Sequence, residues 1–196
     1  MPHQHTPRAI VVVRHGETEW SREGRHTGRA DIPLTSRGRE QAQRLRPLLA
    51  EWDFGAVFAS PLRRARETCE LAGYGDRAIE LEDLMEWDYG DYEGMTWREI
   101  REARPDWSLW RDGVQGGERL DDVAGRAARV LTRAGSIDGD VLLVAHGHLL
   151  RVLTALWLAL PPAAGQRFEL APAAPAVLGH EHDWTVVRRW NVEPCA

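Results

Sequence analysis

The chain has 196 residues, of which 43% are hydrophobic and 28% charged, proportions that are ordinary for a globular domain. Its formal charge of -5 argues against general attraction to nucleic acid or to an anionic membrane. All 25 basic residues are arginine, which excludes Schiff-base chemistry and the lysine of a Walker A loop.

Two strand-then-helix units are predicted in the first half of the chain. The Ile10–Val13 segment is a continuous β-branched run, which is typical of a strand buried on both faces. The spacing of apolar residues predicts a helix over residues 36–52, with Ser36 as its cap. Ala56–Ala59 is a second short apolar strand, and a helix over about residues 61–73 follows it.

The second half of the chain repeats this pattern and ends in a hairpin. A helix is predicted from about residue 120 to residue 133, followed by a third buried strand at Val141–Val144. The next helix carries leucines on one face up to Leu156. Two last strands, residues 176–178 and 185–187, are predicted to form a hairpin whose loop is the segment between them.

Repeated strand-then-helix units predict an α/β fold, a three-layer sandwich with a mostly parallel central sheet and helices on both faces. The chain shows no internal repeat and no linker, so we expect residues 1–196 to form one domain. Ligands of such sheets bind at the carboxyl ends of the strands, where loops lead into helices. The residues that follow the three buried strands are therefore the most informative.

Histidine and arginine side chains follow all three buried strands. RHGET occupies residues 14–18, SPLRRA residues 60–65 and AHGH residues 145–148. Glycine directly after His15 and His146 permits a tight turn and a close approach of the backbone to a ligand. One histidine beside a strand end is usually structural. Cations gathered at three equivalent strand ends instead predict an anion site, with phosphate as the natural ligand.

These segments resemble the motifs of the histidine phosphatase, or phosphoglycerate mutase-like, superfamily. RHGE is similar to the defining motif of that family, and in SPLRRA the second arginine, Arg64, stands where the family's arginine lies. The resemblance implies the phosphoglycerate mutase-like version of the α/β sandwich. It continues in chain order through GRHTG at residues 24–28, PLT at 33–35, EWDYG at 86–90, GGE at 116–118 and AHGH at 145–148.

The resemblance implies a role for each matching residue. His15 is expected to be the nucleophile that takes up the phosphoryl group, with Arg14, Arg64 and His146 around the phosphoryl oxygens. Glu86 is expected to protonate the leaving oxygen and then to activate water. Neighbouring arginine charges disfavour an imidazolium, which keeps the nucleophile neutral. No metal and no cofactor is implied, and the implied substrate-binding residues are Ser21, Thr27, Gly28 and Gly147.

The same family contains mutases as well as phosphatases. Typical cofactor-dependent phosphoglycerate mutases carry longer segments after the glutamate motif than residues 86–110 here, and this chain has Trp87 and Asp88 where those mutases carry a basic residue. Water is therefore favoured as the final acceptor, with a mutase as the second interpretation. Residues 86–95 and 110–113 are similar to sedoheptulose-1,7-bisphosphatase-like enzymes and to actinobacterial acid phosphatases. The expected substrate is a small phosphomonoester, with sugar phosphates first.

Other residues near the predicted site carry open alternatives. Many relatives have an asparagine beside a tryptophan after RHG, where this chain has Ser21, which reaches less far. Arg22, Arg25 and Arg29 could meet a second phosphate or could be solvated loop residues, and His148 could assist the site or support it. Four tryptophans could line a sugar pocket or could pack locally: Trp20, Trp87, Trp107 and Trp110.

Two histidine pairs resemble metal ligands, His3 with His5 and His180 with His182, but neither has partners at zinc-like spacing. A metal-dependent hydrolase and a non-catalytic phosphoprotein-binding module are the remaining alternatives, and the filled catalytic positions count against the second. No signal peptide or membrane-spanning run is visible, so we expect a cytoplasmic protein. Its expected partner is the small-molecule phosphomonoester, with no nucleic acid and no membrane. The oligomeric state stays open, a homodimer included.

Overall fold

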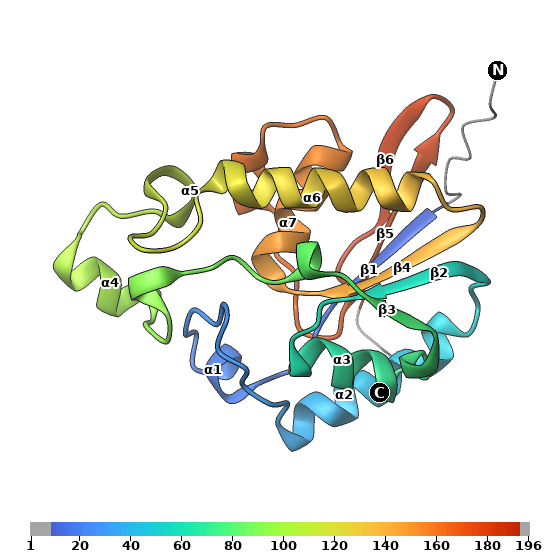
Figure 1. The fold of residues 1–196 in the computed structure, drawn as a ribbon, viewed down its shortest axis with the longest axis horizontal. Helices are drawn as coiled ribbons and strands as arrows, with labels where there is room; N and C mark the ends of the chain where they lie inside the picture. The colour runs from blue at the N-terminus through green and yellow to red at the C-terminus, as the bar shows by residue number, and fades with distance from the viewer. Residues whose placement is uncertain (1–8, 193–196) are drawn as a thin grey trace.

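A six-stranded sheet with helices on both sides forms the centre of the molecule in the computed structural model, which describes residues 9–192 (Figure 1). The strands lie in the order β3-β2-β4-β1-β5-β6. Four are mutually parallel: β1 (Ala9–Arg14), β2 (Phe54–Ala59), β3 (Ala78–Glu80) and β4 (Asp140–Ala145). The last two, β5 (Pro175–Glu181) and β6 (Trp184–Arg189), add an antiparallel hairpin beside β1. The predicted α/β sandwich with a mostly parallel sheet is confirmed.

Two long helices cover each face of the sheet (Figure 1). They are α6 (Leu120–Gly135) and α7 (Gly147–Trp157) on one face, and α2 (Ser36–Leu49) and α3 (Arg63–Leu71) on the other. Successive side chains of a strand point to opposite faces. Ile10 and Val12 of β1 therefore join the core beneath α6 and α7, whereas Val11 and Val13 join the core beneath α2 and α3. The double-sided burial predicted for the first strand is thus confirmed.

Shorter elements gather beyond the carboxyl ends of β1 and β4, on the left of Figure 1. An isolated bridge between Arg25 and Thr96 joins the loop after α1 to the start of α4. The short α-helices among them are α1 (Glu19–Arg22), α4 (Trp97–Ala103) and α5 (Leu109–Asp112). The described chain also has the 3-10 helices η1 (Gly75–Arg77), which directly precedes β3, η2 (Glu82–Leu84), η3 (Gly90–Tyr92) and η4 (Pro162–Arg167).

The first predicted helix is shorter than expected. Its cap is Thr35 rather than Ser36, because the Thr35 side chain accepts a hydrogen bond from the backbone N–H of Gly38 (3.0 Å). The helix ends at Leu49 instead of residue 52, two residues after Pro47, which has no N–H to donate to the helix.

The second predicted helix and the final hairpin also differ in their bounds. The helix expected over residues 61–73 is α3, and Gly73 beyond its end has a φ of 93°, a left-handed conformation that ends helices. The expected hairpin loop is wrong, because Gly179 pairs with Val186 and His180 with Thr185 within the ladder. Ladder pairing uses backbone groups, so polar side chains do not end it.

None of the helices within residues 9–192 combines the length and the apolar character needed to cross a membrane.

Candidate active site

The carboxyl ends of three parallel strands bring the two strand-end histidines together. The backbone N–H of His15 donates to the carbonyl of Ala145 (2.9 Å), and that of Ser60 donates to the carbonyl of Val144 (2.9 Å). These bonds hold the loops after β1, β2 and β4 side by side. The ring centroids of His15 and His146 lie 5.2 Å apart as a result.

His15 is 3% exposed and keeps one ring nitrogen free. Its Nδ1 lies 2.7 Å from the carbonyl oxygen of Gly16, which can only accept, so Nδ1 carries the hydrogen. Burial lowers the pKa of His15 well below its ordinary value, and the charges of Arg64 and Arg14 lower this pKa further. The imidazole is therefore neutral, and its Nε2 presents a lone pair, which is the state that nucleophilic attack requires.

Backbone carbonyls hold the two arginines beside this histidine. Arg14 donates through a terminal nitrogen to the carbonyl of Leu170 (2.8 Å). Arg64 has no exposed surface, and its terminal nitrogens donate to the carbonyls of Thr27, Gly28 and Ala30. In both guanidinium groups, Nε is buried without a hydrogen-bond partner in the described part of the chain. Arg64 therefore holds a loop with its terminal nitrogens, while its Nε makes no hydrogen bond within the described residues.

His146 is fully buried and bonds to a residue that the sequence analysis did not assign to the site. Its Nε2 lies 2.7 Å from Oγ of Ser60, the first residue after β2, while its Nδ1 is buried without a partner in residues 9–192. Burial lowers the pKa of His146 well below its ordinary value, and Arg64 lowers it further. Ser60 could have been found from its position, since it follows β2 as His15 follows β1.

Glu86 is 5% exposed and sits against the first turn of α7. One oxygen accepts hydrogen bonds from the backbone N–H groups of Trp87 and Leu149 (both 2.9 Å), and the other accepts from that of His148 (3.0 Å). Helix amino-termini favour a carboxylate at this position. These contacts aim the carboxyl group at the cavity in front of His15.

A partly buried ion pair supports the loop that carries Glu86. Arg126 donates to both carboxylate oxygens of Glu118 (2.7 and 2.8 Å) and also to the carbonyls of Asp83 and Met85. Glu118 in turn accepts from the backbone N–H of Asp88 (2.9 Å). The GGE segment therefore acts on the site indirectly, by fixing the loop on both sides of Glu86.

A cavity of about 190 Å³ opens in front of these groups. Arg14, His15 and Glu86 line it, whereas Arg64 and His146 are not among its lining residues. The other lining residues are Ser21, Gly24, Arg25, His26, Thr27, Tyr89, Gly147, His148, Arg151 and Leu170. Five of these were not assigned to the site from the sequence, although the first three lie within the family motifs: Gly24, His26, Tyr89, Arg151 and Leu170.

The residues predicted to bind substrate differ in how they face this cavity. Ser21 lines it, but its hydroxyl donates to the carbonyl of Thr18 (3.0 Å) in the cap of α1. Thr27 lines it with a hydroxyl that donates to the carbonyl of Arg25 (3.1 Å). Gly28 is outside the lining, and a side chain there would collide with the backbone of Trp87 and with Glu93. Direct phosphate contact by Ser21, Thr27 or Gly28 stays a prediction.

The two glycines after the histidines have different tasks. A Cβ on Gly16 would lie 2.3 Å from the carbonyl oxygen of Gly38, so Gly16 permits contact between the first loop and α2 rather than approach to a ligand. Gly147 opens α7, and the nearest atom to a Cβ there is Nε of Arg14 at 3.4 Å. The close approach of a ligand to Gly147 stays a prediction.

None of the four tryptophans near the site lines this cavity, and two of them pack within the protein. Trp87 and Trp107 are buried, and their indole N–H groups donate to the carbonyls of Glu118 (2.8 Å) and Gly113 (2.9 Å). Their indole groups are satisfied within the protein, which is the packing alternative.

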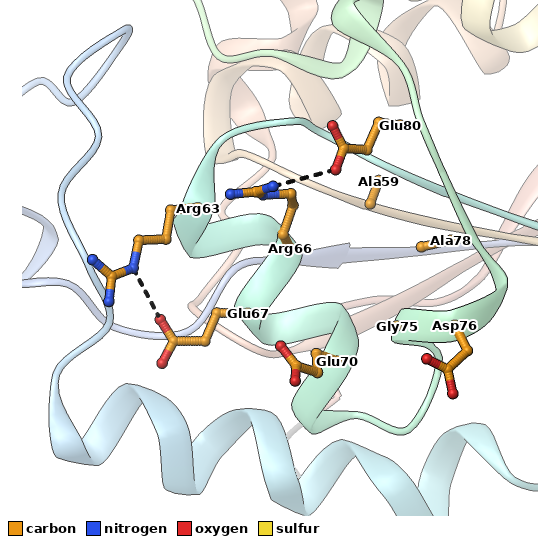
Figure 2. A pocket seen from close by; sticks show the side chains of 9 residues that line it. All are labelled: Ala59, Arg63, Arg66, Glu67, Glu70, Gly75, Asp76, Ala78 and Glu80. Carbon is orange, nitrogen blue, oxygen red and sulfur yellow. Dashed lines mark hydrogen bonds and ion pairs between the residues drawn. The ribbon is translucent and has the colours of Figure 1, made fainter.

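A larger cavity, of about 610 Å³, lies between α3 and β3 (Figure 2). Figure 2 shows Arg63 paired with Glu67 (3.9 Å) and Arg66 paired with Glu80 (3.5 Å) along it. Its lining contains none of the residues predicted for the site. Arg63 thus belongs to this solvated, ion-paired groove, whereas its neighbour Arg64 points inward to the active-site loops.

Within residues 9–192, no group of three or more histidine, cysteine or acidic side chains could hold a metal ion. His180 packs its ring against that of Trp157, with centroids 5.0 Å apart, and His182 lies in the hairpin turn. His3 and His5 lie outside the described residues.

The buried histidines predict that the protein loses stability in acid. Burial depresses the pKa of His15, His146 and His148 in the fold, so below pH ~6.5 the unfolded chain binds protons that the folded chain does not. The free energy of unfolding then falls by at most about 1.4 kcal/mol per pH unit for each imidazole. Urea unfolding at pH 7.5, 6.5 and 5.5 measures this slope. Unchanged stability between pH 6.5 and 5.5 would contradict the prediction.

Comparison with known proteins places these features in a family context. Residues 10–193 match the model of the histidine phosphatase superfamily, branch 1. An acid phosphatase of Mycobacterium tuberculosis is 42% identical over 178 residues, which cover 88% of this chain and 87% of that protein. The sedoheptulose 1,7-bisphosphatase of Saccharomyces cerevisiae is 37% identical over 187 residues, which cover 79% of this chain and 69% of that protein.

A solved structure is similar over nearly the whole length. The product of a Mycobacterium tuberculosis open reading frame superposes with a TM-score of 0.88 at 38% identity, covering 96% of this chain and 99% of that one.

Proposed function

The chain belongs to the histidine phosphatase superfamily, and on that premise we propose that it hydrolyses small phosphomonoesters through a phosphohistidine on His15. Residues 1–196 are taken as one histidine phosphatase domain, which the match over residues 10–193 supports. Catalysis needs no metal ion in this proposal, because the nucleophile and the charges that stabilise the transferring group all come from side chains.

One observation carries the proposal: buried nitrogens without partners surround a neutral histidine. Nε of Arg14, Nε of Arg64 and Nδ1 of His146 make no hydrogen bond within residues 9–192. Buried donors without partners are rare in proteins and call for an explanation. The Ser60 hydroxyl accepts from the N–H of Leu62 and is taken to donate to Nε2 of His146, which makes Nδ1 of His146 a donor. A phosphoryl group in front of His15 offers acceptor oxygens to these donors, so the proposed substrate supplies the missing partners.

The first chemical step forms the phosphoenzyme. Nε2 of His15 attacks phosphorus, the bond from phosphorus to the ester oxygen breaks, and Glu86 transfers its proton to the departing alkoxide. Arg14, Arg64 and His146 stabilise the negative charge on the transferring oxygens from fixed positions.

The second step returns the enzyme to its starting state. The Glu86 carboxylate removes a proton from water while the water oxygen attacks phosphorus, and the bond between phosphorus and Nε2 of His15 breaks. Inorganic phosphate leaves, His15 regains its free Nε2, and Glu86 is again protonated for the next cycle.

Phosphorylated sugars are the proposed substrate class, and the cytoplasm is the proposed location. The yeast relative named sedoheptulose 1,7-bisphosphatase supports a sugar phosphate. The acid phosphatase relative supports hydrolysis rather than transfer to a second metabolite. The mutase alternative uses the same phosphohistidine and differs only in whether water or an organic hydroxyl accepts the phosphoryl group.

Hydrolysis of para-nitrophenyl phosphate in excess EDTA tests the proposal. We expect the parent protein to release para-nitrophenol at the same rate with and without EDTA, because no step uses a metal. Activity that disappears with EDTA and returns with a divalent cation would mean a metal-dependent hydrolase. No activity under either condition would point to a mutase or to a phosphoprotein-binding module.

A further inference from the structure

Two histidines line the active-site cavity without a role in the steps above. The rings of His26 and His148 are parallel within 5°, with centroids 6.3 Å apart. Both belong to the lining that also contains His15 and Glu86. His148 is hydrogen-bonded to a tyrosine hydroxyl, whereas His26 is hydrogen-bonded to a backbone carbonyl. This difference determines whether the other ring nitrogen donates a hydrogen bond to a ligand or accepts one from it.

Tyr89 sets the tautomer of His148. Its hydroxyl lies 2.6 Å from Nδ1 of His148 and has no other hydrogen-bond partner in the described chain. The tyrosine is 2% exposed, and burial raises the pKa of its phenol well above the ordinary value, so it keeps its hydrogen. The phenol therefore donates to Nδ1, and Nε2 of His148 carries the hydrogen. That Nε2–H has no protein partner among residues 9–192 and is accessible from the cavity.

The carbonyl of Met95 sets the opposite tautomer in His26. Nδ1 of His26 lies 2.8 Å from this oxygen, which can only accept, so Nδ1 carries the hydrogen. Nε2 of His26 is then a bare acceptor, likewise without a partner in the described residues and not sealed off from the cavity. Burial lowers the pKa of both His26 and His148, which keeps both rings neutral near pH 7.

We propose that His148 and His26 are specificity-determining residues that bind hydroxyl groups of a phosphorylated polyol or sugar. The inference rests on the proposed phosphatase function and deepens it. A hydroxyl both donates and accepts, so it can receive the Nε2–H of His148 and donate to Nε2 of His26, directly or through a neighbouring hydroxyl. An alkyl or aryl phosphate satisfies neither nitrogen, and leaving such polar groups unpaired costs affinity.

The neutral pair suits hydroxyl groups better than a second phosphate. A phosphate oxygen would face the lone pair of His26, which repels it. Two arginines of the lining are partly engaged within the protein: Arg25 donates to Glu23 (2.7 Å) and to the carbonyl of Gly94 (2.8 Å). Arg151 donates to two carbonyls of η4 (3.0 and 2.9 Å).

A ratio of rates measures this recognition. The probes are D-glucitol 6-phosphate and n-hexyl phosphate, which have the same carbon chain with and without hydroxyls. In the parent, we expect kcat/KM to favour glucitol 6-phosphate. His148→Phe and His26→Phe keep a ring but remove the donor or the acceptor, and each should lower this ratio about tenfold, the effect of one hydrogen bond. The matched control is His180→Phe, remote from the cavity, which should leave the ratio unchanged.

The outcomes separate this inference from the proposed function. A parent that hydrolyses para-nitrophenyl phosphate, with ratios within twofold in both variants, would overturn the recognition role alone. A parent inactive on every phosphomonoester would overturn the phosphatase proposal itself.

Nitrogen-15 NMR of the histidine rings tests the inference first in the parent protein, where it needs neither turnover nor a variant. At pH 7 we expect His148 with hydrogen on Nε2 and His26 with hydrogen on Nδ1. Tyr89 is a positioning residue in this proposal. In Tyr89→Phe, the His148 signal should move towards the tautomer with hydrogen on Nδ1. The KM for glucitol 6-phosphate should also rise more than kcat falls. The reverse tautomers in the parent would overturn the inference whatever the kinetics.

Discussion

His15→Ala should lower the turnover of para-nitrophenyl phosphate at least about 10⁴-fold, because the variant has no atom that can take up the phosphoryl group. The nearest ring, His146, has its Nε2 bound to Ser60, so it is not a ready replacement. The remaining arginines can still bind substrate, and KM should therefore change less than kcat.

Trapping of the phosphoenzyme shows whether His15→Ala loses turnover because the nucleophile is missing. Acid-labile, alkali-stable phosphate should label the parent during turnover and should be missing from His15→Ala. His180→Ala is the matched control, since it removes a histidine far from the cavity, and thermal unfolding of all three proteins checks that each is folded. Label or turnover at the parent level in His15→Ala would contradict the mechanism.

The main architecture could be predicted because it depends on the pattern of apolar residues. The continuous apolar runs of β1 and β4 contribute alternate residues to the two cores, which a sequence expresses directly. Short elements have too few apolar residues in a regular pattern to be predicted in this way. β3 has three half-exposed or exposed residues at the sheet edge, and α1 has four residues with none buried. The start of α4 had a local signal, the capping box of Thr96 and Glu99.

The position of the site could be predicted, but its inner contacts could not. Strand ends and family motifs pointed to His15 and Glu86, because topology decides where strand ends meet. Arg64 donates to three carbonyls of a distant loop, and Gly16 packs on Gly38. Both contacts depend on the paths of loops, which no local sequence pattern encodes. The pairing of Tyr89 with His148 joins residues 59 positions apart and was equally invisible.

Glu86→Gln should separate substrates by their leaving groups. A glutamine cannot donate a titratable proton, so formation of the phosphoenzyme from an alkyl phosphate such as glucitol 6-phosphate should slow by about 10² to 10⁴-fold. Para-nitrophenolate leaves without help, and its release in the first turnover should slow less than about tenfold. Hydrolysis of the phosphoenzyme also needs Glu86, as the base, and should be slow whichever substrate was used.

Rapid-mixing kinetics resolve these two steps. With para-nitrophenyl phosphate, Glu86→Gln should give a burst of about one para-nitrophenol per enzyme followed by slow steady-state release. With glucitol 6-phosphate it should give no burst of alcohol, because the first step is then slow as well. Glu80→Gln is the matched control, since this carboxylate lines the separate groove with Arg66 and should leave both steps at parent rates. Three backbone N–H groups hold the Glu86 carboxylate, and a glutamine cannot accept from all three. Equal slowing of the first step for both substrates would therefore mean that Glu86 positions the phosphoryl group and does not protonate the leaving oxygen.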